Sequence, residues 1–341
     1  MAKEKTKKLD TYGIDEKIEA LLAGDRRSAA RLITLVENES EALYEIMSKV
    51  FPNSRNSTIL GITGPGGAGK STLIDHLITE YRKDQKTIGV VSIDPSSPFS
   101  GGAFLGDRIR MQKHSNDPGV YIRSLASRGH LGGLSRATYN VIRILEAMGA
   151  DIILVETLGA GQDEIEVHSV AHTCLLVVTP GMGDDIQAMK SGILEIADII
   201  VVNKSDMEGA DTCFRSLVEM LSATCSEKDK WMPRLISTVS AARNSKDIKG
   251  IDELIGAIAE HQTFIHSSGF IEKIKFERVK RELEVIFKTE LQNYYFNGYY
   301  EMNNLKDQIE GIIHGERDPY TLVKEFFNSL KTQRKSLPSP H

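Results

Sequence analysis

The chain has 341 residues, which is enough for one large α/β domain with additions or for two domains. Its formal net charge is −5, so no excess of basic residues points to nucleic acid or to a membrane surface as the main partner. The three cysteines lie far apart without paired spacing, which argues against a disulfide framework or a zinc site and for a reducing compartment.

No stretch of the sequence suggests a membrane span, because no apolar run reaches about 18 residues. The Lys-rich start, residues 1–12, is followed by no apolar segment, so we expect neither a signal peptide nor a membrane anchor. These features favour the cytoplasm, although a mitochondrial protein whose leader has been removed would look the same.

Apolar residues recur at helical spacing from Ile14 to Phe51, with breaks at residues 24–25 and 38–40. We therefore expect two or three short helices within an N-terminal helical region, residues 1–56. A turn-rich segment then leads into the first strand.

The segment from Ser57 to Asp75 carries the motif around which the other predictions are arranged. A β-branched, apolar run meets a glycine-rich turn with the Gly-x-x-x-x-Gly-Lys-Ser spacing of a P-loop, and a helical pattern follows. Glycines let backbone N–H groups converge on an anion, and the helix adds its positive N-terminal dipole. We expect Lys70 to reach the β- and γ-phosphates and the Ser71 hydroxyl to ligate magnesium. The predicted phosphate-binding residues are Gly64, Gly66, Gly67, Ala68, Gly69, Lys70, Ser71 and Thr72.

After the P-loop, buried-strand patterns alternate with helical patterns as far as residue 265. This alternation predicts a doubly wound, largely parallel sheet in a P-loop domain over residues 57–265. The strand patterns cover residues 86–94, 121–125, 151–157, 172–179, 198–206 and 233–241, and the helical patterns include 136–148, 186–196, 212–223 and 251–261.

Three carboxylates are expected near the magnesium ion and the γ-phosphate. Asp94 and Glu156 each end a strand, at the sheet edge where open α/β sheets bind their ligands, and Glu156 stands where a Walker B acid would. Asp107 lies in a polar loop and could instead be a solvated charge. Gly159 lets the backbone approach the γ-phosphate, and Gln162 could orient water or be a plain surface residue. With Lys70, the three acids are the candidate catalytic residues, and with Ser71 they are the candidate magnesium ligands.

The tetrad Asn203-Lys204-Ser205-Asp206 has the Asn-Lys-x-Asp form at the end of a strand. A carboxylate at Asp206 can accept hydrogen bonds from N1–H and the 2-amino group of guanine, which adenine does not offer in that arrangement. A site built to satisfy such donors discriminates strongly against the analogue that lacks them. Ser240 and Ala241, after the next strand, fit the loop that backs the base, so GTP and GDP are the expected ligands.

From residue 266 the helices are charged on one side and apolar on the other, which predicts a C-terminal helical region over residues 266–332. One long helix is expected at 270–293, followed by helices at 302–313 and 319–330 and by a disordered tail at 333–341.

His168 and His172 lie four residues apart, with Glu164 upstream, so a zinc site is an open alternative. The pattern supports it only weakly, because Glu164 does not stand at the spacing of a characteristic third ligand.

Several segments together resemble one family, the MeaB/ArgK (methylmalonic aciduria type A protein) GTPases of the metallochaperone branch. They are GITGPGGAGKSTL, SIDPSSPFSGGAFLGDRIRM, RSLASRGHLGGLS, VETLGAGQDEIEV and VNKSD. The resemblance covers roughly residues 15 to 330. The chain differs mildly from the family's ETVGVGQ pattern, because it has Leu158 and Ala160 in place of the two valines.

The resemblance implies a homodimeric GTPase chaperone that gates adenosylcobalamin loading of an acyl-CoA mutase, usually methylmalonyl-CoA mutase, and protects or reactivates it. It places Asp94, Asp107 and Glu156 on the family's magnesium and switch acids. It also places residues 180–190 on a further switch that contacts the mutase, and the C-terminal helices on a dimerisation region. Two other functions stay open, a small-molecule kinase and a metal-insertion GTPase, although neither an acceptor pocket nor a Cys- or His-rich motif stands out.

Overall fold

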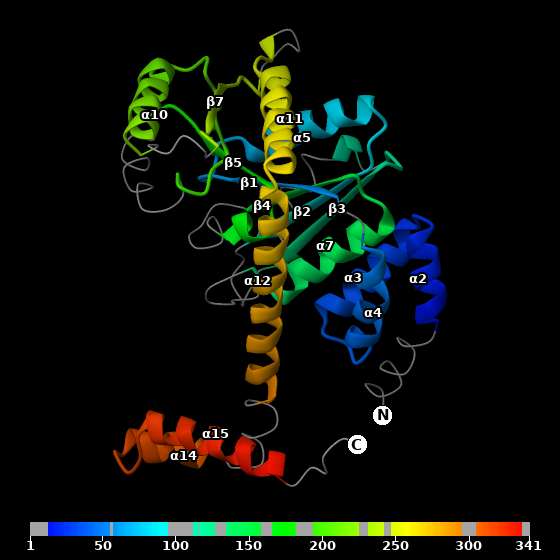
Figure 1. The fold of residues 1–341 in the computed structure, drawn as a ribbon, viewed down its shortest axis with the longest axis vertical. Helices are drawn as coiled ribbons and strands as arrows, with labels where there is room; N and C mark the ends of the chain where they lie inside the picture. Colours follow the sequence, from blue (N-terminus) through cyan, green and yellow to red (C-terminus); the bar gives the residue numbers. More distant parts are fainter. Residues whose placement is uncertain are drawn as a thin grey trace. The chain divides into compact units, whose positions relative to one another are not determined.

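The computed structural model divides into two compact units, residues 1–282 and residues 283–341 (Figure 1). The expected helix at residues 186–196 lies mostly outside the part of the chain that the structure describes. The described residues are 13–54, 57–94, 112–114, 116–126, 134–157, 166–181, 194–224, 231–241, 247–294 and 305–335.

Within these residues, seven strands of the first unit form one sheet in the order β3-β2-β4-β1-β5-β6-β7, and each neighbouring pair is parallel. The inner strands are buried on both faces because helices cover both sides of a parallel sheet. The expected doubly wound α/β fold is thus confirmed. The strands are β1 (Thr58–Thr63), β2 (Ile88–Asp94), β3 (Val120–Ala126), β4 (Ile152–Thr157), β5 (Thr173–Val178), β6 (Ile199–Val202) and β7 (Arg234–Ser237).

One helical layer carries the P-loop helix, α5 (Lys70–Lys83), next to α11 (Ile251–Ser267). Leu77 of α5 and Leu254 of α11 are fully buried in the same apolar cluster as the inward side chains of the strands. A third helix, α10 (Ala210–Thr224), packs against β6 and β7. The helix that begins with the predicted phosphate-binding residues is therefore anchored to the sheet along its length.

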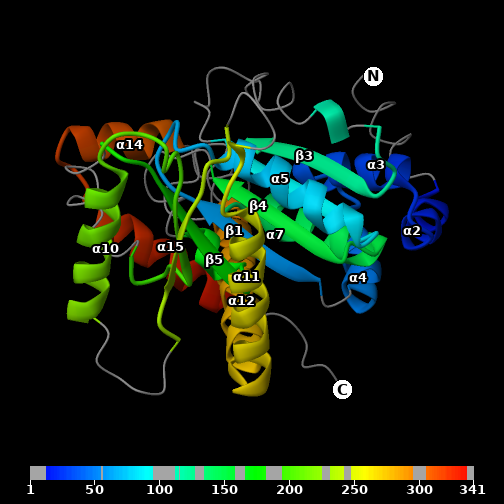
Figure 2. The same cartoon turned by 90° about the horizontal axis from the view of Figure 1, so that it is seen from above.

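The N-terminal helices pack around α7 (Arg136–Met148), as Figures 1 and 2 show. They are α2 (Ile14–Leu22), α3 (Arg26–Glu37) and α4 (Leu43–Val50). Helix α3 begins where it does because a carboxylate oxygen of Asp25 accepts the backbone N–H of Ser28 at 2.7 Å, which satisfies one free donor of the first turn.

The first half of α12 (Phe270–Asn293) is joined to α7 by a buried ionic network. Arg278 donates to Glu146 at 2.8 Å, and Arg143 donates to Glu282 at 2.7 Å. These buried charges therefore have an opposite charge within hydrogen-bonding distance, and removing one partner of such a pair is strongly destabilising. The network thus holds the start of α12 in the first unit.

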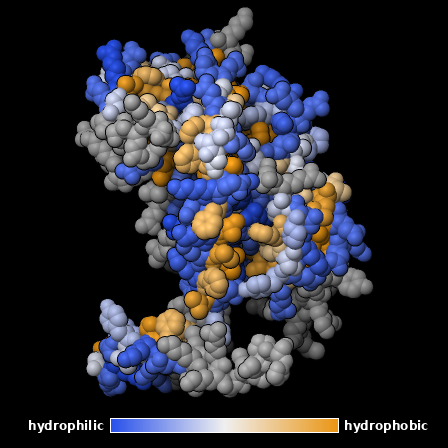
Figure 3. Space-filling view, viewed as in Figure 1, coloured by the Kyte–Doolittle hydropathy of each residue, from blue (hydrophilic) through white to orange (hydrophobic). Residues whose placement is uncertain are grey.

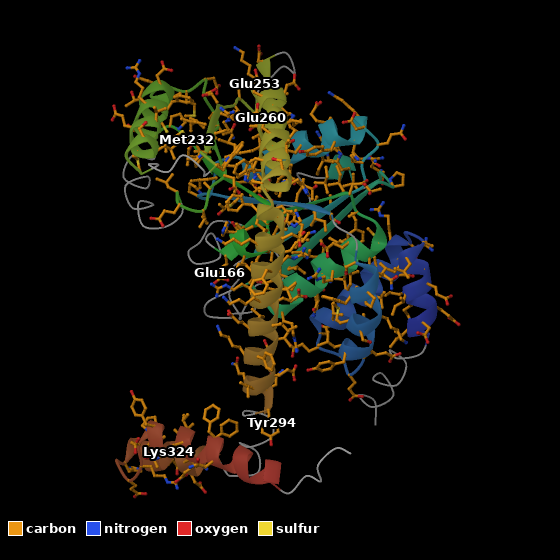
Figure 4. The ribbon with its side chains drawn as sticks, in the orientation of Figure 1. Glu166, Met232, Glu253, Glu260, Tyr294 and Lys324 are labelled. Atoms are coloured by element: carbon orange, nitrogen blue, oxygen red, sulfur yellow. The ribbon has the colours of Figure 1, made fainter. Side chains whose placement is uncertain are left out.

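In the second unit, Tyr294 follows α12, and its ring centroid lies 6.3 Å from that of Phe326 on α15 (Pro319–Lys335) (Figure 4). A further helix, α14 (Leu305–Ile313), precedes α15. None of the described helices is both long and apolar enough to cross a membrane.

Apolar side chains also lie exposed along α12, where Figure 3 shows them among hydrophilic neighbours. Phe276 is 68% exposed and Phe287 is 65% exposed. With Val279, Leu283 and Leu291, which are also exposed, they follow one another at helical spacing and form an apolar stripe.

Candidate functional site

The P-loop connects β1 to α5, and its backbone tolerates only glycine at two positions. Gly64 has a φ of 135°, and a Cβ built there would lie 2.1 Å from the carbonyl oxygen of Val177. Gly69 has a φ of 94°, and its Cβ would lie 2.3 Å from the side-chain nitrogen of Asn203. These positive φ values and close approaches explain why the motif has glycine at both ends of the loop.

Lys70 is buried at the first position of α5. Its ammonium group donates to the carbonyl oxygens of Gly64 and Pro65, at 2.5 and 3.0 Å. The charge therefore lies within the curve of the loop, where backbone N–H groups and the helix dipole also favour an anion.

Ser71 and Glu156 come together although 85 positions separate them in the chain. The Ser71 hydroxyl donates to a carboxylate oxygen of Glu156 at 2.8 Å, and the Glu156 side chain is fully buried. The pairing of β1 with β4 brings this about, because Ile62 faces Glu156 across the two strands. The structure thus places two oxygen-bearing side chains, both expected as metal ligands, at the start of α5.

The structure describes the other expected acids and switch residues only in part or not at all. Asp94 is the last residue of β2, which lies beside β4, but only its backbone belongs to the described structure. Asp107, Gly159, Gln162 and residues 182–190 lie outside the described residues. Their roles therefore stay predictions.

The base-recognition candidates meet the P-loop through the side chain of Asn203. Its amide nitrogen donates to the carbonyl oxygen of Ala68 at 2.8 Å. Its amide oxygen accepts from the Thr238 hydroxyl at 3.1 Å and from the backbone N–H of Ser240 at 3.2 Å. Asn203 itself is fully buried, so one side chain links the phosphate loop, the end of β6 and the loop after β7.

The neighbours of Asn203 extend this link. Lys204 has a φ of 56°, and its ammonium group donates to the carbonyl oxygen of Gly67 at 2.8 Å. Asp206 follows in a turn and is exposed, as is Ala241, whereas Ser240 is buried. The exposed Asp206 carboxylate is thus accessible to a ligand near the phosphate loop.

A family model described as Methylmalonyl Co-A mutase-associated GTPase MeaB matches residues 29–298. This chain belongs to the MeaB family. The family resemblance of the sequence motifs is thereby confirmed.

Relatives named as GTPases are similar to this MeaB-family chain. A putative GTPase of Pyrococcus abyssi is 51% identical over 278 residues, which covers 80% of this chain and 83% of the relative. The GTPase ArgK of Escherichia coli is 31% identical over 328 residues, which covers 93% of this chain and 97% of the relative. The solved structure of a LAO/AO transport system kinase is 23% identical, with a TM-score of 0.67, and covers 94% of this chain and 98% of that one. This last likeness supports the fold.

Two consecutive polar side chains of α5 make contacts that reasoning from the sequence missed. On α5, Asp75 accepts a hydrogen bond at 2.8 Å from His114, which ends the short helix η2 (Gln112–His114). The next residue, His76, contacts the carbonyl oxygen of Ser240 at 2.8 Å. No sequence signal could have found these contacts, because they depend on how distant loops meet the helix.

Of the zinc hypothesis built on His168, His172 and Glu164, Glu164 lies outside the described residues. Among the residues that the structure describes, no group of three His, Cys, Asp or Glu could hold a metal ion. His172 has a different role in the structure. Its Nδ1 accepts the backbone N–H of Ile59 at 3.1 Å, and its own backbone N–H donates to the carbonyl oxygen of Ile59 at 2.8 Å. The imidazole therefore supports the junction of β1 and β5.

We expect the stability of the protein to fall in mild acid because of His172. Burial, and then the positive charges of Arg278 and Lys275, lower the pKa of His172 from 6.5 to about 3. Between pH 3 and pH 6.5 the unfolded chain binds a proton at this histidine that the folded chain does not. The free energy of unfolding therefore rises with pH across this window, and the contribution of His172 is complete above it. Between pH 7 and pH 5 the loss should be about 2 kcal/mol.

Urea unfolding followed by the fluorescence of Trp231, the single tryptophan of the chain, measures this loss at both pH values. His172→Asn keeps an acceptor near Nδ1 but does not titrate, so its stability should change by about 2 kcal/mol less over the same pH interval. An equal change in both proteins would contradict the assignment to His172.

Proposed function

We propose that this protein is a GTP-hydrolysing G protein of the metallochaperone type. The observation that carries the proposal is the side chain of Asn203, which joins the phosphate-binding loop to the loop that includes Ser240. A motif suited to guanine therefore lies beside a motif suited to phosphates. Membership of a family of named GTPases supports the same activity.

In this proposal, the backbone of residues 64–72 binds the phosphate groups, and Lys70 binds the β- and γ-phosphates. Its ammonium group already lies within the loop, where it would neutralise charge that develops on the phosphate oxygens during hydrolysis. Asp206 accepts the guanine N1–H and 2-amino hydrogens. Ser240 and Ala241 support the base from the other side.

Magnesium fits the donor set near the start of α5. The Ser71 hydroxyl and the Glu156 carboxylate offer oxygen ligands, which Mg²⁺ prefers, and lie 2.8 Å apart. Asp94 and Asp107 are the other proposed ligands, on the basis of their sequence positions. The ion would neutralise charge on the β- and γ-phosphate oxygens when it is bound.

We also propose that nucleotide state is read by a partner, an adenosylcobalamin-dependent acyl-CoA mutase. The family description, which names methylmalonyl-CoA mutase association, supports this choice. GTP would hold the loops around Asp107 and Gly159, and hydrolysis would release them. Residues 180–190 are the proposed contact with the mutase.

A homodimer is part of the proposal, with residues 266–332 as the dimerisation region. The apolar stripe of α12 supports it, because exposed apolar side chains at helical spacing favour burial against a partner.

A cytoplasmic location is supported by the cysteines, since Cys174 and Cys213 are both free and buried.

The test is GTP hydrolysis with and without an adenosylcobalamin-dependent acyl-CoA mutase, with ATP as the control nucleotide. Strong stimulation for GTP alone is expected, because a partner that completes the site of a G protein can raise the rate of hydrolysis by several orders of magnitude. Phosphate release measured by a coupled assay gives the rate. Cobalamin transfer to the mutase, followed by absorbance, reports the delivery role separately.

The outcomes separate the parts of the proposal. GTP hydrolysis that does not respond to the mutase would contradict the proposed partner but would still support the GTPase activity. Equal use of ATP would remove the guanine specificity. Transfer of the γ-phosphoryl group to a small molecule instead of water would replace the GTPase by a kinase.

A further inference from the structure

The P-loop helix α5 has two consecutive side chains that contact different parts of the chain. Asp75 binds His114 and Lys113, which belong to the segment that leads into β3. His76 reaches the loop after β7, which is distant in the sequence, and lies 2.8 Å from the carbonyl oxygen of Ser240. One rigid helix therefore contacts both the segment before β3 and the proposed base-binding loop.

The hydrogen bond between His76 and Ser240 has a defined direction. A carbonyl oxygen only accepts, so Nε2 of His76 carries the hydrogen and donates it. On its other side, Ser240 is held by its backbone N–H, which donates to Asn203 at 3.2 Å. The peptide groups before and after Ser240 are thus each fixed by one side chain, and Ser240 is only 2% exposed.

The orientation of the Ser240 carbonyl determines where the next backbone N–H points. The peptide bond is planar and trans, so the C=O of Ser240 and the N–H of Ala241 point in opposite directions. Guanine carries a carbonyl acceptor at position 6, whereas adenine carries an amino donor there. A backbone N–H held in a fixed direction toward the base can therefore favour guanine over adenine.

We propose that His76 is a positioning residue for guanine selection, which rests on the proposed function of the site. By holding the Ser240 carbonyl, His76 fixes the direction of the Ala241 N–H. The same helix begins with Lys70 and Ser71, about one and a half turns earlier. Helix α5 thus sets the spacing between the phosphate-binding residues and the base-binding loop.

The test compares His76→Phe, which removes the donor, with His76→Gln, whose amide can donate to the same carbonyl. Dissociation constants for GDP, IDP, ADP and inorganic pyrophosphate are measured by calorimetry. We expect the Phe variant to bind GDP and IDP about tenfold more weakly, because the buried carbonyl loses its partner and the loop loses its orientation. Binding of pyrophosphate should stay unchanged, and the Gln variant should recover most of the affinity for GDP.

A matched control is His114→Phe, which removes a similar histidine hydrogen bond to Asp75, the residue before His76 on α5. It should leave the ratio of GDP to ADP affinity unchanged. Thermal unfolding of each variant checks that the fold is retained, and His76→Ala replaces the Phe variant if the larger ring does not fit.

The outcomes distinguish this inference from the proposed function. An equal loss of GDP and pyrophosphate affinity, no loss at all, or no recovery with Gln would overturn the role of His76. If the unsubstituted protein binds GDP and ADP equally, the guanine specificity of the site fails, and the role of His76 in selection fails with it.

Discussion

Replacement of Lys70 by alanine should lower kcat/KM for GTP hydrolysis at least about 100-fold, as expected when a preorganised charge at the reacting group is lost. The ammonium group is buried at the start of α5 and donates to two carbonyl oxygens of the loop. It is therefore held in place before a nucleotide binds. Without it, the negative charge that develops on the phosphate oxygens has one compensating group fewer.

A phosphate-release assay at several GTP concentrations separates the effects on KM and kcat for this variant. The matched control is Lys83→Ala in the last turn of the same helix, where the lysine pairs with Glu80 and its side chain is 65% exposed. The control should hydrolyse GTP at the unsubstituted rate, since surface ion pairs of this kind contribute little. Normal turnover by Lys70→Ala would contradict the proposed role of the Lys70 ammonium group at the reacting phosphates.

Asp206→Asn should change the base preference of the site from guanine to xanthine. The affinity for GDP should fall about 100-fold or more. The carboxylate only accepts hydrogen bonds, as the two guanine donors require, whereas an asparagine presents one acceptor and one donor. Xanthine has a carbonyl oxygen in place of the 2-amino group, so the asparagine donor suits it. Asp206 is exposed in the turn after β6, and the substitution is therefore compatible with the fold.

Binding of GDP and XDP by both proteins, measured by calorimetry, tests the exchange. Asp211→Asn makes the same chemical change in the first turn of α10, away from the P-loop contacts, and should leave both affinities unaltered. A loss of GDP binding with no gain for XDP would contradict direct recognition of the base by Asp206.

Most of the fold could be predicted from the sequence, as two helices and one strand illustrate. The boundaries of α7 (Arg136–Met148) and α12 (Phe270–Asn293) agree with the predicted 136–148 and 270–293, because long helical periodicity is a local property. The predicted strand at 198–206 is shorter in the structure. It ends at Val202, and the polar tetrad that follows forms the turn in which Lys204 has a positive φ.

The P-loop and the Asn-Lys-x-Asp tetrad were recognisable because each is a run of neighbouring residues with a fixed spacing, which a single sequence displays directly. The sequence by itself thus determined the alternating α/β architecture, the P-loop motif, the Asn-Lys-x-Asp motif and the family. The tertiary structure alone decided which distant side chains meet. Ser71 reaches Glu156 through the pairing of β1 with β4, and His76 reaches Ser240 through the packing of α5 against the sheet. Such contacts depend on strand order and helix packing, which no local pattern of residues encodes.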